Sequence, residues 1–337
     1  MNVQLLSCAL SWIVASATVF MPSALAEQST ATDSPTSVES RDEALWTGPL
    51  LASSASTLPQ GHWLFEPYLY NSVAVGRFDG RGDRSSERHS ATVGSLAYLI
   101  YGATERVSVG VIPKFAYRNA SGPGGSSGFG MGDFSVQAQY RLTQFSEEHR
   151  VPTTSVIVIE TLPTGKYDRL DENSQSALGS GAYITTLAFY SQYYFWLPTG
   201  RILRTRLNVG FAWPGSASVA DSSVYGTSAG FSGHARVGRT ATMDAACEYS
   251  VSRNWVLALD IVGEHDDNTR VTGKGVGPSF AGGYASSLGS SAQLVIAPAI
   301  EFNWNAHVGV IAGTRIAGLG RNATQTLAGV VALNMVF

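Results

Sequence analysis

The sequence predicts an all-β fold, a transmembrane antiparallel up-and-down β-barrel of about twelve strands. Charged residues make up only 14% of the 337 residues, whereas soluble proteins carry roughly 25%. Beyond the N-terminal segment, no apolar run reaches the roughly 18 residues that a membrane-spanning helix needs. Apolar and polar residues instead alternate in segments of strand length. This combination is typical of a barrel whose outer face contacts lipid.

The N-terminus has the features of a cleavable export signal. Residues 5–25 form an apolar stretch interrupted by Ser and Thr, and it closes on Ala24-Leu25-Ala26. Signal peptidase recognises such an A-x-A tripeptide, so we expect residues 1–26 to be removed between Ala26 and Glu27. A membrane-spanning helix is the alternative, which the polar residues within the stretch disfavour.

Two segments precede the first expected strand. Residues 27–45 are rich in Ser, Thr, Asp and Glu, and we expect them to form a disordered mature N-terminus. Residues 46–61 are apolar and small, and we hypothesise that they fold into the periplasmic mouth of the barrel as a plug. A tether that crosses the periplasm is the alternative. The residues of the possible plug that we single out are Trp46, Pro49, Leu50 and Leu51.

Residues 62–337, the expected barrel, divide into segments of period two. In the clearest segment Phe134, Val136 and Tyr140 alternate with Ser135 and Gln137. Successive side chains of a strand point to opposite faces, so one face of this segment is apolar and the other is polar. The same pattern predicts strands at 62–76, 88–101, 106–117, 132–142, 152–162, 183–196, 203–213, 233–250, 255–266, 287–302, 306–317 and 323–337.

The connections between these strands alternate in length, and aromatic residues gather near the short ones. Outer-membrane barrels have short periplasmic turns, longer external loops and aromatic girdles at the membrane surfaces. We therefore expect both termini on the periplasmic side and long Gly/Ser-rich loops outside the bacterial cell. Cys247 would be the only cysteine after signal removal, which excludes an intrachain disulfide, and it fits one apolar position in a strand.

The chain ends on an aromatic residue of its last expected strand. Leu327, Val331 and Phe337 share one face, whereas Thr326 and Asn334 lie on the other. The alternation makes Phe337 the lipid-facing edge of that strand. We expect barrel-assembly machinery to engage the chain there, and outer-membrane lipids to surround the apolar face.

Charges of both signs fall on the expected lumen faces. They could form a structural network of ion pairs, or they could line a permeation path and tune its selectivity. The candidate permeation-path residues are Glu66, Lys114, Arg141, Arg204, Arg206, Asp244, Glu248, Asp260, Glu264 and Glu301, and we expect Arg106 and Glu160 on the same polar faces.

No residue pattern predicts a catalytic or cofactor site. The glycine run at 128–133 precedes a strand rather than a helix, so it lacks the helix N-terminus that would hold a phosphate. The six histidines are scattered without metal-ligand spacing. Ser232 and His234 would share a strand face, but they have no matching third residue. We therefore expect no cofactor, no metal ion and, at a net charge of -3, no nucleic-acid partner.

Several turn-and-strand motifs resemble a family of outer-membrane transporters of the meta-pathway of phenol degradation type. They are Trp46-Thr47-Gly48-Pro49-Leu50-Leu51, Leu58-Pro59-Gln60-Gly61-His62-Trp63, Glu66-Pro67-Tyr68, Tyr101-Gly102-Ala103-Thr104-Glu105-Arg106 with Val107-Ser108-Val109-Gly110, Gly130-Met131-Gly132-Asp133 and Leu162-Pro163-Thr164-Gly165-Lys166-Tyr167. The resemblance implies a barrel for passive uptake of small hydrophobic or aromatic compounds, without catalytic residues. A structural or adhesive barrel that uses its external loops is the alternative, and an outer-membrane lipid hydrolase is a minor one.

Overall fold

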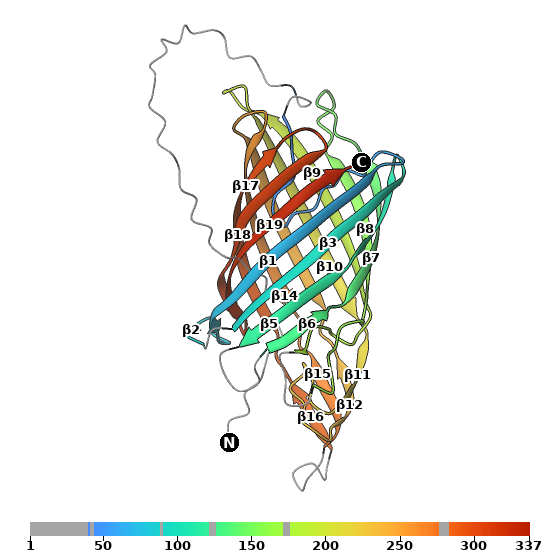
Figure 1. Ribbon diagram of the computed structural model, residues 1–337, viewed down its shortest axis with the longest axis vertical. Coiled ribbons are helices and arrows are strands. Elements are labelled where there is room, and N and C mark those ends of the chain that lie inside the picture. The colour runs from blue at the N-terminus through green and yellow to red at the C-terminus, as the bar shows by residue number, and fades with distance from the viewer. Residues whose placement is uncertain (1–39, 41–43, 88–89, 121–125, 171–175, 276–282) are drawn as a thin grey trace.

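The chain forms one closed antiparallel barrel with a smaller sheet at one end (Figure 1). The predicted signal and most of the polar N-terminal segment lie outside the described residues. Within the described residues, no helix has the length and apolar character that crossing a membrane requires. The computed structural model describes residue 40 and residues 44–337, except 88–89, 121–125, 171–175 and 276–282.

The barrel wall has twelve strand positions, as the sequence predicts. Two positions consist of two collinear pieces: β4 continues into β5 beyond Pro113, and β6 continues into β7. In order around the wall, the strands are β1 (Trp63–Phe78), β3 (Ser90–Thr104), β4 (Val107–Ile112) with β5 (Lys114–Ala120), β6 (Ser126–Met131) with β7 (Phe134–Thr143), β8 (Thr153–Leu162), β9 (Ile184–Trp196), β10 (Ile202–Pro214), β13 (Thr240–Ser250), β14 (Trp255–Asp266), β17 (Ser291–Asn303), β18 (Val308–Arg321) and β19 (Thr324–Val336).

Pairing of the first strand with the last closes the barrel. β1 runs antiparallel to β19 from Leu64 opposite Val336 to Arg77 opposite Thr324. The terminal residue extends this ladder, because Phe337 N donates to Trp63 O at 2.8 Å. β2 (Arg84–Ser85) adds a short hairpin to the far end of β1. Closure leaves no barrel edge with unpaired backbone groups, which a lipid environment would not tolerate.

The two faces of each strand have the predicted polarity. On β10, Arg204 and Arg206 point inward and are each 6% exposed, whereas Leu207 and Phe211 point outward and are 41% and 50% exposed. Because side chains alternate along a strand, this outward exposure of large apolar groups recurs around the wall and produces a continuous apolar band.

Aromatic side chains ring the outer surface at the end of the barrel where the turns are short. Trp63 lies 4.6 Å from Tyr101 and Trp255 lies 4.7 Å from Phe302, measured between ring centroids. Trp304 continues the ring beside Phe302. This arrangement confirms the girdle predicted from the sequence, and we refer to this end of the barrel as the periplasmic end.

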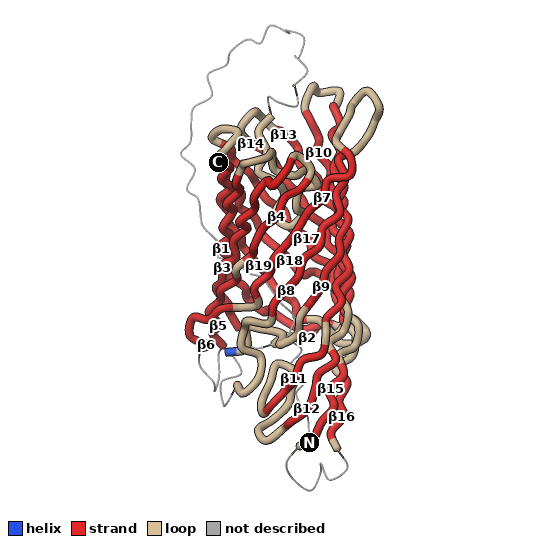
Figure 2. Tube along the Cα trace, turned by 90° about the vertical axis from the view of Figure 1, so that its right-hand side faces the viewer, coloured by secondary structure: helices blue, strands red, loops and turns tan. Residues whose placement is uncertain are grey.

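The opposite end has a four-stranded sheet that the sequence did not predict. Its strands are β11 (Ser216–Ala220), β12 (Ser232–Arg236), β15 (Arg270–Lys274) and β16 (Tyr284–Ser287), all antiparallel. The sheet projects beyond the barrel in both views (Figures 1 and 2). One of its faces packs on a buried apolar cluster that includes Val219, Phe231 and Val271. Segments expected to be irregular loops therefore have a hydrophobic core of their own.

Two strand boundaries differ from the predicted ones for this reason. The strand expected at 233–250 is two strands, β12 and β13, separated at Gly238. A Cβ at Gly238 would lie 1.9 Å from the carbonyl oxygen of Asp267, so only glycine permits this approach of two backbones. The strand expected at 287–302 begins at Ser291, and the residues before it belong to β16 and a turn.

Candidate functional site: the N-terminal segment in the lumen

Residues 44–58 lie inside the barrel at its periplasmic end and contact inward-facing side chains of several strands, whereas Pro59, Gln60 and Gly61 are exposed in the turn that leads into β1. Leu50 and Ala52 are 2% exposed, and Ala55 is fully buried. None of the residues between Thr47 and Ala55 lies in a helix or a strand. Their backbone groups therefore need partners from the barrel wall, since buried amides without partners are costly.

Asp260 of β14 binds three backbone amides of this segment. Its carboxylate accepts hydrogen bonds from the N–H groups of Leu50, Leu51 and Ala52 at 3.0, 3.3 and 2.9 Å. Hydrogen bonds to an ionised acceptor are roughly twice as strong as neutral ones. Three consecutive backbone amides of the segment therefore bind a single carboxylate of the barrel wall.

Glu301 and Asn303 of β17 hold the residues just before this turn. Glu301 Oε2 accepts from Thr47 N at 2.7 Å and from Gly48 N at 3.1 Å. The hydroxyl of Thr47 lies 2.8 Å from Asn303 Oδ1. Gly48 has a φ of +127°, a conformation that L side chains rarely adopt, and a Cβ there would lie 3.1 Å from an Arg206 nitrogen. Glycine is therefore needed where the segment passes the arginine.

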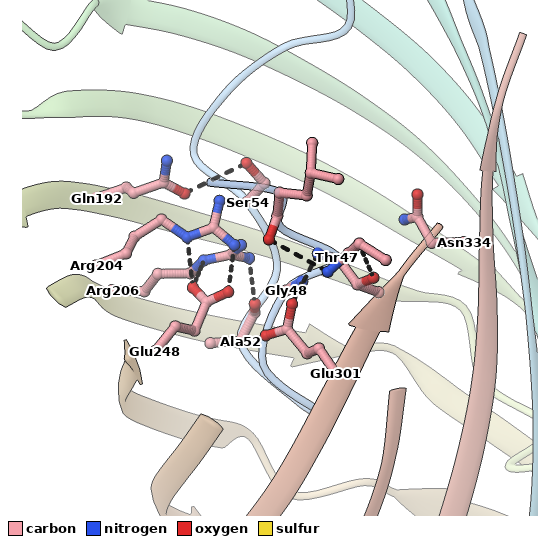
Figure 3. Close-up of polar contacts among 12 residues, drawn as sticks. Thr47, Gly48, Ala52, Ser54, Gln192, Arg204, Arg206, Glu248, Glu301 and Asn334 are labelled. Atoms are coloured by element: carbon pink, nitrogen blue, oxygen red, sulfur yellow. Dashed lines mark hydrogen bonds and ion pairs between the residues drawn. The ribbon is translucent and has the colours of Figure 1, made fainter. Parts of the chain in front are cut away.

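Two arginines and one glutamate complete a buried charged cluster beside the segment (Figure 3). Glu248 of β13 bonds Arg204 through both carboxylate oxygens, and its Oε2 lies 3.2 Å from Arg206 Nε. Arg206 also donates to Ala52 O at 2.7 Å. The guanidinium of Arg204 lies 4.6 Å from the centroid of Trp46. These pairings offset the cost of desolvating the charges and join them to the segment.

The other contacts of the segment are amide, hydroxyl and apolar. Gln139 of β7 donates to Ser54 O at 3.1 Å, and Asn208 of β10 donates to Ser53 O at 3.0 Å. Leu50 packs in a cluster with Ile311. The charged side chains that bond the segment come from β10, β14 and β17, so the segment is held mainly against that part of the wall.

A cavity of about 330 Å³ lies beside the segment, toward the opposite part of the wall. Its lining includes residues 46–54 and 56–58 of the segment together with side chains of β1, β3, β4, β7, β8 and β19. Among the wall side chains that line it are Leu64, Glu66, Tyr68, Leu96, Tyr98 and Asn334. The segment therefore occupies the lumen without filling it.

The predicted lumen charges separate into one cluster and several isolated positions. Arg204, Arg206, Glu248, Asp260 and Glu301 lie together against the N-terminal segment. The remaining candidates lie outside this cluster. Glu66 accepts a hydrogen bond from Asn334 at 3.2 Å, Lys114 lies 3.4 Å from Ser135 Oγ, and Glu264 lies 3.5 Å from Arg315. Asp244 is buried on β13, and Arg141 lies near the periplasmic rim.

Two expected lumen charges are elsewhere. Glu160 points outward near the far end of β8, where Thr185 donates to it at 2.7 Å, because the inward positions of β8 include Ser155 and Ile157. Arg106 is exposed in the turn between β3 and β4. Both expectations were wrong because the polarity of a side chain does not by itself determine which face of a strand it lies on, as for Glu160, or at which residue the strand begins, as for Arg106.

Sequence reasoning overlooked one buried lumen charge and the tyrosines of the cavity. Arg315 is 3% exposed and lies on the same face of β18 as Ile311 and Ala317, so its apolar neighbours concealed the lumen face. Tyr68 lies two positions after Glu66 on β1, whereas Tyr98 lies opposite Glu66 on β3. Counting period two from that glutamate would have placed Tyr68 in the lumen.

Ser232 and His234, the weak catalytic candidate, lie exposed on β12 in the external sheet. The strand register places His234 between Ser218 and Thr272, neither of which is a carboxylate. The pair therefore lies in the external sheet and not on a strand of the barrel wall.

Comparisons with known proteins identify a family and a fold. The family described as "Putative MetA-pathway of phenol degradation" matches residues 80–324. No relative was found among curated proteins. The crystal structure of an outer membrane channel from Pseudomonas putida F1 is similar with a TM-score of 0.65 and 15% identity, covering 84% of this chain and 98% of that one. A mutant of the monoaromatic hydrocarbon channel TodX has a TM-score of 0.44 and 11% identity, covering 82% and 91%.

Proposed function

The chain belongs to this phenol-degradation family, and from that premise we propose that it is a passive channel of the bacterial outer membrane for small hydrophobic or aromatic compounds. The observation that carries the proposal is the lumen, which holds a bonded N-terminal segment with a cavity beside it. The family description names phenol degradation, and the similar Pseudomonas putida structure is that of an outer membrane channel. We propose a transport role without catalysis.

In this proposal residues 46–61 act as a periplasmic plug. Asp260, Glu301 and Arg206 support it, because these wall side chains bind the backbone of the segment. Deleting residues 46–57 should raise the ionic conductance of the barrel in planar bilayers. A deletion of equal length, residues 30–41, is the matched control and should leave the conductance unchanged. Equal conductance of both variants and the intact protein would refute the plug.

Export and assembly follow the same proposal. Residues 1–26 would be removed after Ala26, so the mature chain would begin at Glu27. Phe337, which is 68% exposed at the end of the closing ladder, would be the residue that barrel-assembly machinery engages. Outer-membrane lipids would contact the apolar band. Mass spectrometry of protein isolated from outer membranes tests whether the mature chain begins at Glu27. The folding yield of Phe337→Ala in cells tests whether the assembly machinery engages Phe337.

A second candidate function, adhesion, has one observation in its favour. The free face of the external sheet is basic: Arg236 lies directly opposite Arg270, with His234 and Lys274 on the same face. Like charges directly opposite each other destabilise a sheet unless an anion lies between them. Retention of the barrel on a dextran sulfate column, lost in the Arg236→Ala/Arg270→Ala variant, would favour adhesion to an anionic surface polymer.

A further inference from the structure

We propose that the cavity beside the N-terminal segment binds an uncharged aromatic molecule with a hydroxyl group, and that Glu66 makes this site reject aromatic carboxylates. The inference rests on the proposed channel function and names the class of solute that it selects. It is carried by the way three strands align their inward side chains around the cavity.

The register of β1 with its neighbours builds one polar row between two apolar rows. Glu66 lies opposite Tyr98 of β3 and bonds Asn334 of β19, so these three polar side chains form one row across the wall. One pair position toward the periplasm, Leu64 lies between Ile100 and Val336.

The row on the other side of Glu66 is also mainly apolar. Tyr68 lies opposite Leu96 of β3 and Ala332 of β19, and its ring meets the ring of Tyr98 edge-on, with 5.9 Å between the centroids. Leu96 is 6% exposed. A flat ring with a hydroxyl on its edge matches this alternation, because apolar rows contact the ring while the polar row bonds the hydroxyl.

The charges around the cavity distinguish a phenol from a benzoate. Glu66 lines the cavity, and no described cation forms an ion pair with it. Arg206 also lines the cavity, but Glu248 and Ala52 O already bind its guanidinium. An anionic solute would therefore face a carboxylate that has no ion-pair partner among the described residues, and like charges repel at this distance. A neutral hydroxyl can instead donate to that carboxylate.

The size of the cavity agrees with a small solute. Its volume of about 330 Å³ is at the lower end of the roughly 300–1,000 Å³ found for small-molecule sites. The N-terminal segment provides one wall through residues that include Pro49 and Leu50. A single aromatic ring with a substituent fits better than a fused or extended molecule.

Binding is measured on the purified full-length barrel in detergent at pH 8, by saturation-transfer NMR with phenol and with benzoate as probes. A phenol hydroxyl has a pKa near the value of about 10 for tyrosine, so phenol is neutral at this pH. We expect phenol to bind and benzoate to bind at least about tenfold more weakly. Glu66→Gln keeps hydrogen-bonding capacity and removes the charge, so it should raise benzoate affinity at least about tenfold with phenol affinity within about twofold.

Matched variants separate this site from the rest of the lumen. Glu264→Gln removes a lumen carboxylate outside the cavity and should leave both affinities unchanged. Leu96→Asn places a polar amide in the row of Tyr68, Leu96 and Ala332, where only the Tyr68 hydroxyl is polar, and should weaken phenol binding. The inference is overturned if phenol does not bind, or if Glu66→Gln and Glu264→Gln change benzoate affinity equally.

Two separate measurements distinguish failure of the binding site from failure of the channel proposal. Ionic conductance after deletion of residues 46–57 tests the channel, whereas NMR binding to the intact barrel tests the site. Conductance without phenol binding would refute the site alone, and phenol binding without conductance would refute the channel alone.

Discussion

Replacing Asp260 by alanine should release the N-terminal segment from the lumen. Three backbone amides of the segment lose their acceptor at once, those of Leu50, Leu51 and Ala52. A hydrogen bond to a charged group contributes about 1.5–3 kcal/mol, so the three bonds set an upper bound of about 4.5–9 kcal/mol. Removing a buried carboxylate also relieves its desolvation cost, and lumen water can reach the freed amides.

We therefore expect a net loss of about 3 kcal/mol, below that upper bound because of these two compensating effects. Every 1.4 kcal/mol is a factor of ten in an equilibrium constant, so the released state should become on the order of 100-fold more populated. Asp260→Asn retains one acceptor oxygen without the charge and should give an intermediate effect of roughly tenfold.

Cysteine labelling reports this release. Ala55 is fully buried in the lumen, so Ala55→Cys in a Cys247→Ser protein expressed without residues 1–26, and therefore without Cys8, provides a single protected thiol. Its rate of reaction with a maleimide is proportional to the population of the released segment when opening is fast. Asp260→Ala should raise that rate on the order of 100-fold.

The matched control is Asp244→Ala. Asp244 is a buried lumen carboxylate on the neighbouring strand β13, and in the described structure it forms no hydrogen bond with the segment. Its replacement should leave the labelling rate of the reporter cysteine within about twofold. An unchanged rate in Asp260→Ala, or an equal increase in Asp244→Ala, would refute the assignment of Asp260 as the anchor.

Three further predictions concern the glycines and the lipid face. Gly48→Ala places a Cβ 3.1 Å from Arg206 at a φ of +127°, so it should cost about 1–3 kcal/mol and also raise labelling of the lumen cysteine. Gly238→Val should push apart β12 and the backbone at Asp267, making the external sheet sensitive to trypsin while the barrel keeps its heat-modifiable migration on gels. Ile261→Lys on the outer face of β14, 44% exposed, should destabilise the inserted barrel by about 2–4 kcal/mol, measured by urea titration in lipid vesicles.

Much of the barrel could be predicted because its strands obey one local rule. Alternation of period two sets which side chains of β10 face lipid, and Leu207 and Arg206 follow it without reference to any other strand. The rule fails where backbone contacts decide. The bend at Gly238 depends on Asp267, a residue in another connection. The external sheet arises from pairing between two connections, each of which looks irregular when taken alone.

The candidate site could be predicted in composition but not in arrangement. The sequence indicates that Arg204, Asp260 and Glu301 belong to the lumen, and that residues 46–61 differ from the polar tail before them. It contains nothing that pairs Asp260 with amides more than 200 positions earlier. The row of Asn334, Glu66 and Tyr98 likewise exists only because β1 pairs with both the last strand and β3.

By itself, the sequence determined the fold class, the even strand number, the polarity of the two faces and the aromatic girdle, because each depends on residues near one another along the chain. Only the tertiary structure decided which lumen charges meet, where the N-terminal segment lies and which part of the lumen stays open. Those features depend on barrel closure and strand register, which bring together residues from the two ends of the chain.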